Sequence, residues 1–351
     1  MISQSLTSFV RRGLVVLGAC AAFGVGSVFA QDTTTTCEEG FRLFDHEVLV
    51  TDPVCIPENP QRINYLIYAS YLYPFGVTPV GAWGFERDAA NFPVIADWIS
   101  QEGIADLGLP PSLEALTATQ PDLMIMADTR VTEIVDELPM IAPTLIYSEG
   151  ANWRDRHLFL GAVFGQEAEA EAQLAVVDQR ISELSAAFTA KYGDVTEQKA
   201  SLVRIFEPGN YFLASERYTS VEILTQIGFQ IAEEVQNIDA WGVSFGDEDI
   251  KLANADFTIL IGSTGGANNQ SVQGEEMVAE LMANPLWNTL DAFQNEQVFA
   301  VGDYFQQSSL MAAHQIVDEY ERIFDVEIET PNPFLSAVQA EATPEATEAA
   351  S

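Results

Sequence analysis

The most regular pattern of hydrophobic and polar positions lies near the middle of the chain. Residues 167–192 contain neither glycine nor proline, and their larger apolar side chains recur at alternating spacings of three and four residues. This spacing predicts a single amphipathic helix over Glu167–Tyr192, about 39 Å long at 1.5 Å per residue. Acidic residues near its start and Lys191 near its end suit the helix dipole. Such a helix could join two lobes or could be one long core helix.

The sequences on either side of this helix share an order of elements. Each half has an apolar strand, a helical stretch, a glycine, a short strand and then a glutamate that is followed eight residues later by an aspartate and an apolar run. These last units are Glu114, Asp122 and 123–127 in the first half, and Glu248, Asp256 and 257–261 in the second. The opening strands are expected at 65–68 and 211–214. Alternating strands and helices predict a parallel sheet in each half.

We therefore expect an α/β fold of two Rossmann-like lobes, joined by one long interlobe α-helix, with a ligand cleft between the lobes. A single doubly wound domain is the alternative. The expected boundaries are 62–164 for the N-terminal lobe, 165–193 for the interlobe helix and 194–326 for the C-terminal lobe.

Both ends of the chain differ in composition from this α/β part. Residues 1–30 have paired arginines, an apolar run and a small-residue site at Ala30, which is typical of an export signal cleaved after that residue. A lipobox-like stretch ending at Cys20 indicates a lipid anchor as the alternative, and the export route stays open. Residues 31–61 are expected to form a spacer and a hairpin. Residues 327–351 are expected to be a low-complexity tail.

Removal of such a signal leaves two cysteines, Cys37 and Cys55. In an exported chain an isolated pair favours one disulfide that closes an N-terminal loop. A metal site is the alternative, but two thiols without a nearby histidine cluster are a poor ligand set.

Charge excludes two classes of partner. The chain has 15 Lys and Arg against 52 Asp and Glu, a formal net charge of −37. Such a surface repels phosphate backbones and anionic lipid headgroups, so nucleic acid is not an expected partner. With 48% hydrophobic residues the chain can still build ordinary cores. An acidic, lysine-poor surface that faces the external medium would also suit high salt.

No pattern of a catalytic site is present in the sequence. It lacks a phosphate-binding loop and a G-x-S-x-G elbow, and its three histidines, His46, His157 and His314, are far apart. We therefore expect neither an enzyme nor a cofactor or metal centre. A secreted α/β hydrolytic enzyme is the rival class.

Binding chemistry is better represented. In α/β sheets ligands lie beyond the carboxyl ends of the strands, and the loops expected there combine arginines with aromatic residues. Planar guanidinium groups beside aromatic walls suit a rigid, oxygen-rich ligand. The alternative is that each arginine pairs with one of the many acids. The candidate ligand contacts are Arg87, Arg130, Arg154 and Arg217, with Trp83, Trp153, Tyr211, Trp241 and Tyr304 as walls.

Several short motifs along the chain together resemble one protein family. They are 59–63 (NPQRI), 75–81 (FGVTPVG), 120–125 (QPDLMI), 141–144 (IAPT), 284–287 (NPLW) and 295–299 (NEQVF). In order and spacing they are similar to the substrate-binding proteins of ABC importers for iron(III)-siderophores and cobalamin, the helical-backbone class (class III). The resemblance covers residues 62–324, and residues 167–192 fall where the family has its interlobe helix.

The resemblance implies an exported solute-binding protein, periplasmic or at the cell surface, that captures an iron(III)-siderophore complex between its lobes. It would act as a monomer and deliver this ligand to an ABC importer permease and its ATPase. In the family one glutamate on each lobe docks on the permease, and Glu114 and Glu248 match those positions. Cobalamin or haem is the alternative ligand, haem through a tyrosine such as Tyr71 or Tyr211.

Overall fold

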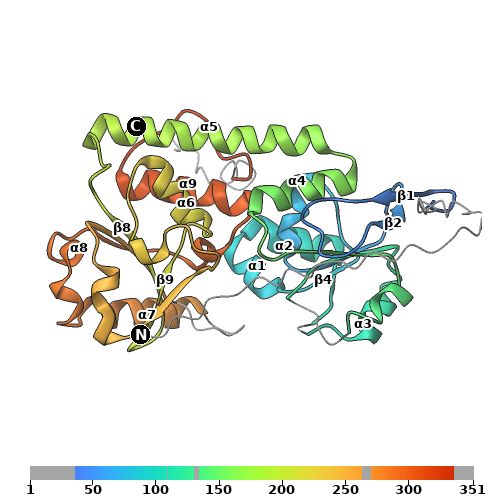
Figure 1. Ribbon diagram of the computed structural model, residues 1–351, viewed down its shortest axis with the longest axis horizontal. Coiled ribbons are helices and arrows are strands. Elements are labelled where there is room, and N and C mark those ends of the chain that lie inside the picture. Colours follow the sequence, from blue (N-terminus) through green and yellow to red (C-terminus); the bar gives the residue numbers. More distant parts are fainter. Residues whose placement is uncertain (1–35, 109, 130–133, 263–269, 336–351) are drawn as a thin grey trace, which may run out of the picture. The chain divides into compact units, whose positions relative to one another are not determined.

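The pattern at residues 167–192 forms one continuous helix, α5 (Glu167–Tyr192), in the computed structural model of the chain. Its ends are the predicted ends. α5 bridges two α/β lobes, each built on a five-stranded sheet (Figure 1). The predicted fold of two lobes joined by a long helix is therefore confirmed.

The structure describes residues 36–108, 110–129, 134–262 and 270–335. The predicted export signal with Cys20 and Ala30, the candidate contact Arg130 and the tail residues 336–351 lie outside the described residues. Within the described ranges, no helix is both long enough and apolar enough to cross a membrane.

The first lobe contains a fully parallel sheet with strand order β5-β4-β3-β6-β7. Every residue of its central strands β3 and β6 is buried, as expected for strands that are covered on both faces. The strands are β3 (Ile63–Leu66), β4 (Gly81–Ala82), β5 (Ala105–Asp106), β6 (Leu123–Ala127) and β7 (Thr144–Tyr147). The helices are α1 (Phe85–Asn91), α2 (Pro93–Glu102), α3 (Leu113–Ala118) and α4 (Trp153–Phe164), with the 3-10 turns η1 (Ala69–Tyr71), η2 (Tyr73–Phe75) and η3 (Leu138–Met140).

The second lobe departs from the predicted all-parallel sheet. Its strand order is β10-β9-β8-β11-β12, and β9 runs antiparallel to both of its neighbours. The apolar run 211–214, expected to open this lobe, is instead the second arm of a β-hairpin, because Pro208 and Gly209 turn the chain back after β8. Gly209 has φ 81°, a left-handed conformation that glycine adopts without steric cost. The strands are β8 (Ala200–Glu207), β9 (Asn210–Ala214), β10 (Gly242–Phe245), β11 (Phe257–Gly262) and β12 (Val298–Ala300).

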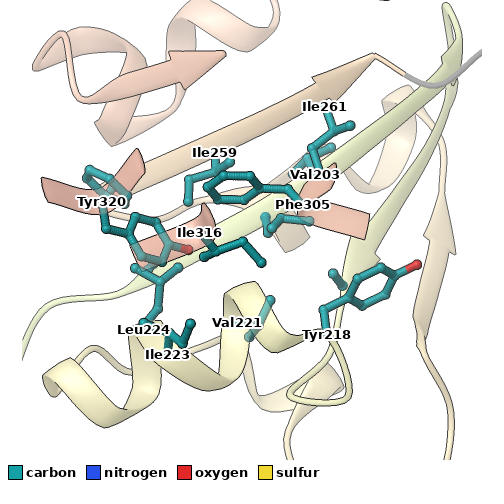
Figure 2. Close-up of a cluster of buried hydrophobic side chains, with 14 of the residues drawn as sticks. Val203, Tyr218, Val221, Ile223, Leu224, Ile259, Ile261, Phe305, Ile316 and Tyr320 are labelled. Atoms are coloured by element: carbon teal, nitrogen blue, oxygen red, sulfur yellow. The ribbon is translucent and has the colours of Figure 1, made fainter. Parts of the chain in front are cut away.

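Helices α6 (Thr219–Ile227) and α9 (Leu310–Phe324) pack against this sheet. Figure 2 shows Val221 and Leu224 of α6 gathered with Ile316 of α9 and Ile259 of β11, and all four side chains are buried. Burying one such side chain contributes about 1.5–3 kcal/mol relative to leaving it exposed. The other elements of the lobe are α7 (Gln270–Met282), α8 (Asp291–Gln294), η4 (Glu233–Val235), η5 (Asp247–Ala253), η6 (Trp287–Thr289) and η7 (Asp303–Gln306).

After α9, the segment 326–335 runs alongside α5. The Glu183 carboxylate of α5 accepts hydrogen bonds from the backbone amides of Glu329 and Thr330, at 3.1 and 2.9 Å. Asn332 is buried and donates from its side chain to Asp318 of α9. Within the predicted tail 327–351, residues 328–332 are therefore hydrogen-bonded to both α5 and α9.

An antiparallel hairpin precedes the first lobe. A disulfide joins Cys37 to Cys55, the pairing that the cysteine count favours. Arg42 attaches the hairpin to the lobe, since its Nη2 donates hydrogen bonds of 2.8 Å to the carbonyls of Ala162 and Val163 near the end of α4. The strands of the hairpin are β1 (Phe41–Phe44) and β2 (Val54–Pro57).

We expect the disulfide to stabilise the protein because it closes a loop in the unfolded chain. At a sequence separation of 18, loop-closure entropy corresponds to about 3 kcal/mol. Replacing Cys37→Ser together with Cys55→Ser should lower the free energy of unfolding by about that amount in urea denaturation followed by circular dichroism. Wild-type protein under a reducing agent is the control and should shift equally. An unchanged midpoint in both samples would contradict the expectation.

Candidate functional site

Arginine side chains connect the two lobes. Arg87 lies on α1 of the first lobe, and its Nε is 3.0 Å from a carboxylate oxygen of Asp303 in η7 of the second lobe. Its Nη1 donates to the Tyr68 hydroxyl at 3.2 Å, and its Nη2 donates to the Gln306 side-chain oxygen at 3.5 Å. Burial opposes the charge of Arg87, but Tyr68 and Asp303 outweigh this and raise its pKa. The side chain is 33% exposed, so a charged group that bridges the lobes still reaches solvent.

Arg217 makes a second connection between the lobes. It follows β9, and its two terminal nitrogens donate to the carbonyl of Gly150 in the first lobe and to the carboxylate of Asp239. Its guanidinium lies 5.2 Å from the ring centre of Trp241, within the range of a cation–π interaction. Two of the predicted ligand contacts, Arg217 and Trp241, are therefore brought together.

A third arginine, Arg204 in β8, was not among the predicted contacts. Its guanidinium lies 4.9 Å from the ring centre of Phe206 and 5.8 Å from that of Phe212. Its Nη1 donates to the Tyr218 hydroxyl at 2.8 Å. A charged residue inside the apolar run 202–206 is the sequence signal that could have identified it, because an arginine within a buried strand needs specific partners.

Arg204 and Arg217 belong to one surface of the second lobe. The Tyr218 ring meets Trp241 edge-on, with ring centres 5.3 Å apart, and meets Phe212 in the same manner at 6.4 Å. The aromatic rings therefore connect the two guanidinium groups without a break. We call this set the arginine–aromatic face: Arg204, Phe206, Phe212, Arg217, Tyr218 and Trp241.

Trp153 and Arg154 of α4 have a different setting from the predicted one. Trp153 is 3% exposed, and its Nε1 donates to the Glu222 carboxylate of α6 at 2.9 Å. Arg154 forms ion pairs with the same Glu222 at 3.2 Å and with Asp178 of α5 at 2.7 Å. This is the alternative considered above, in which an arginine pairs with acids. The two side chains join α4 to α5 and α6.

The other predicted walls are mostly buried. Tyr211 is 1% exposed, packs edge-on against Trp287 at 4.9 Å and donates from its hydroxyl to Asp247 at 3.1 Å. Trp83 is 5% exposed within the first lobe. Tyr304 is half-buried beside Asp303, and burial followed by the nearby Glu319 raises its pKa. Among these three, Tyr304 alone retains substantial exposure.

The histidines are engaged within the protein. Burial lowers the pKa of His157 to about 4, and its Nε2 lies 2.9 Å from the side-chain oxygen of Gln173. His314 contacts Arg180, and burial followed by that positive charge lowers its pKa to about 3. His46 accepts a hydrogen bond from the amide of Val48. In the part of the chain that the structure describes, no three His, Cys, Asp or Glu side chains are grouped so that they could hold a metal ion.

Glu114 and Glu248 are exposed at corresponding places in the two lobes. Glu114 lies in the first turn of α3, and Glu248 in the first turn of η5. The aspartates eight residues later also have equivalent roles: Asp122 accepts from the amide of Arg62 at 2.9 Å, and Asp256 accepts from the amide of Lys199 at 2.8 Å. The repeated spacing in the sequence therefore reflects an equivalent arrangement in each lobe, although α3 is an α-helix and η5 is a kinked 3-10 helix.

Asp88, next to Arg87 in α1, holds the turn η1 of the first lobe in place. Its carboxylate is fully buried in α1 and accepts hydrogen bonds from the amide and the hydroxyl of Ser70, at 3.0 and 2.7 Å. Burial raises the pKa of Asp88 to about 7, although both bonds from Ser70 act in the opposite direction. Asp88 therefore changes its charge near neutral pH. Because it fixes η1, this change also bears on Tyr71.

Known proteins place this chain in a family. Residues 105–304 match the family model described as periplasmic binding protein. Because this match covers more than half of the 351 residues, the chain belongs to that family. The family indicated by the sequence motifs is thereby confirmed, and its members are solute-binding proteins rather than enzymes.

Individual relatives and solved structures are similar over most of the chain. The probable siderophore-binding lipoprotein YfiY of Bacillus subtilis is 26% identical over 281 residues, which cover 77% of this chain and 84% of that protein. The ferric enterobactin-binding periplasmic protein FepB of Escherichia coli is 27% identical over 225 residues, 61% of this chain and 67% of that protein. The crystal structure of Staphylococcus aureus SirA complexed with staphyloferrin B has a TM-score of 0.67 at 24% identity, and it covers 82% of this chain and 99% of that chain. The similarity to the SirA structure is evidence for the fold alone.

The raised pKa of Asp88 leads to a pH dependence. Above pH 7 the folded state holds an ionised, buried carboxylate, whereas the unfolded chain ionises Asp without that penalty. Relative to Asp88→Asn, wild type should therefore gain about 1 kcal/mol of stability as the pH falls from 8 to 6.5, measured by urea titration of both proteins. His157 and His314 act in the opposite direction below about pH 7 in both proteins, since the unfolded chain takes up their protons more readily, so the difference between the two proteins isolates Asp88. The same slope in both proteins would refute the assignment.

Proposed function

We propose that this protein is exported, captures an iron(III)-siderophore complex between its lobes and delivers it to the permease of an ABC importer. The family membership supports capture of a solute. Two of its relatives, a probable siderophore-binding lipoprotein and a ferric enterobactin-binding periplasmic protein, support the ligand class and the export. The protein acts as a monomer in the periplasm or at the cell surface.

The observation that carries the ligand assignment is the arginine–aromatic face. The protein has a net charge of −37, yet Arg204 and Arg217 lie beside aromatic rings at the same side of the second lobe. Iron(III) chelates present carboxylate, catecholate or hydroxamate oxygens around the metal, together with flat apolar parts. Guanidinium groups donate to such oxygens in a fixed planar geometry, and aromatic rings contact the apolar parts.

The segments have distinct parts in this proposal. The lobes 62–164 and 194–326 enclose the ligand, and the interlobe helix 165–193 holds them at one separation. Arg87 approaches from the first lobe and meets the Asp303 carboxylate of the second. A bound chelate would replace this carboxylate as a partner of the Arg87 guanidinium. The export signal 1–30 is removed, or the chain is anchored at Cys20.

The arginine–aromatic face can be tested by titration. Ferric citrate, ferric enterobactin and ferric staphyloferrin B should be added separately while tryptophan fluorescence is recorded. At least one should quench saturably, and Arg204→Gln or Arg217→Gln should weaken that chelate about 10- to 100-fold, because each loses a charge-assisted hydrogen bond. Arg62→Gln is the matched control: Arg62 donates to the carbonyl of Gln120 at the amino end of β3 and should bind as wild type. No saturable quenching by any chelate would refute the proposed function.

Docking on the permease is assigned to Glu114 and Glu248. Each is exposed near the start of a helical turn on its own lobe, so an arginine of a membrane partner could reach both. The double replacement Glu114→Arg and Glu248→Arg should abolish iron uptake into cells that carry the transporter, while chelate affinity stays within about twofold of wild type. The control, Glu102→Arg with Glu280→Arg, makes the same charge change at two other exposed acids, one in each lobe, and should keep uptake. Equal loss of chelate binding in the first variant would contradict the docking role.

A further inference from the structure

A small pocket lies where the two lobes meet, apart from the arginine–aromatic face. Ser70 and Tyr71 of η1 and Arg156 of α4 line it from the first lobe. Ser308 and the first residues of α9 line it from the second lobe. None of the lining residues is an aspartate or a glutamate, although the chain has 52 of them.

The pocket contains a buried positive charge. Arg156 is 5% exposed, its Nη2 donates to the carbonyl of Ser308, and its guanidinium lies 5.5 Å from the ring centre of Tyr71. Among the described residues, no group accepts a hydrogen bond from its Nε, and no carboxylate forms an ion pair with it. Glu149 acts on Arg156 electrostatically without forming an ion pair with it. A buried charge without a contacting partner of opposite sign is costly, so the site favours an anion.

The second lobe presents further donors to the same pocket. Leu310 and Met311 line it from the first turn of α9, where backbone amides have no acceptor within the helix. The N-terminus of this 15-residue helix also carries the positive end of the helix dipole. Ser308 is 5% exposed, and its buried hydroxyl has no hydrogen-bond partner among the described residues.

Other polar groups at the pocket are already engaged. The hydroxyl of Ser70 donates to Asp88, and Nε2 of His157 contacts Gln173. Burial lowers the pKa of His157 to about 4, so this ring adds no positive charge at neutral pH. The electrostatic character of the pocket is therefore set by Arg156 and by the start of α9.

We propose that this pocket binds a small inorganic monoanion, with chloride as the physiological ligand. The anion accepts hydrogen bonds from Arg156 Nε, the Ser308 hydroxyl and the first amides of α9. It supplies a negative partner in direct contact with Arg156, and because its donors come from both lobes it ties α4 to α9. Anion binding here does not require the iron chelate, and the experiment that tests it is done without any chelate.

The test compares thermal unfolding of the full chain in sodium chloride and in sodium gluconate at equal ionic strength, so that surface screening is the same in both. Gluconate is too large for the pocket. Chloride should raise the midpoint of wild type by about 2–4 °C in a saturable manner, since a ligand that binds only the folded state stabilises it. Ser308→Val, which removes the hydroxyl and fills the pocket, should show no such rise.

Thr219→Val is the matched control, because Thr219 also has a buried hydroxyl without a partner among the described residues, but it does not line the pocket. This variant should respond to chloride as wild type does. An equal response in all three proteins, or none in wild type, would overturn the site and leave a pocket that holds water only. If Ser308→Val fails to fold, crystals of wild type grown in bromide decide: anomalous density beside Arg156 supports the site, and its absence there refutes it.

Discussion

The guanidinium of Arg180 lies in the middle of α5 and is 1% exposed, so its charge has to be satisfied inside the protein. Removing such an ion from water costs several kcal/mol, which only close partners can offset. Those partners belong to two other segments: the carbonyl of His314 and the carboxylate of Asp318 in α9, and the carbonyl of Thr330 in 326–335. α5, α9 and the C-terminal segment must therefore lie together. The position of the start of α9 between the lobes depends on that arrangement.

Three of the 15 positively charged residues of this acidic chain lie where the lobes meet. Arg87 and Arg217 each bond to a group of the opposite lobe, and Arg156 reaches the carbonyl of Ser308. Long-range repulsion from a net charge of −37 acts on any anion that approaches. At physiological ionic strength that repulsion is screened within about 8 Å, so these local positive groups decide what binds. A chelate and a small inorganic anion can therefore both be attracted to a protein that is acidic overall.

Sequence patterns anticipated the features that depend on neighbours along the chain. The helix Glu167–Tyr192 has its predicted ends, because its apolar spacing and its flanking glycines are local signals. The spacing from Glu114 to Asp122 and from Glu248 to Asp256 also corresponds to an equivalent aspartate hydrogen bond in each lobe. The hairpin of β8 and β9 was missed, because the run 211–214 reads equally well as a parallel or an antiparallel strand.

By itself the sequence determined the α/β class, the two lobes, the long helix and the family, since periodicity and short motifs are properties of consecutive residues. Only the tertiary structure decided which arginines could face a ligand. Trp153 and Arg154 bond to Glu222 of α6. Arg204, within an apolar strand, lies beside Phe206 and Phe212 instead. The physical reason is that with so many carboxylates in the chain, the partner of an arginine is set by distance in space, which spacing along the sequence does not encode.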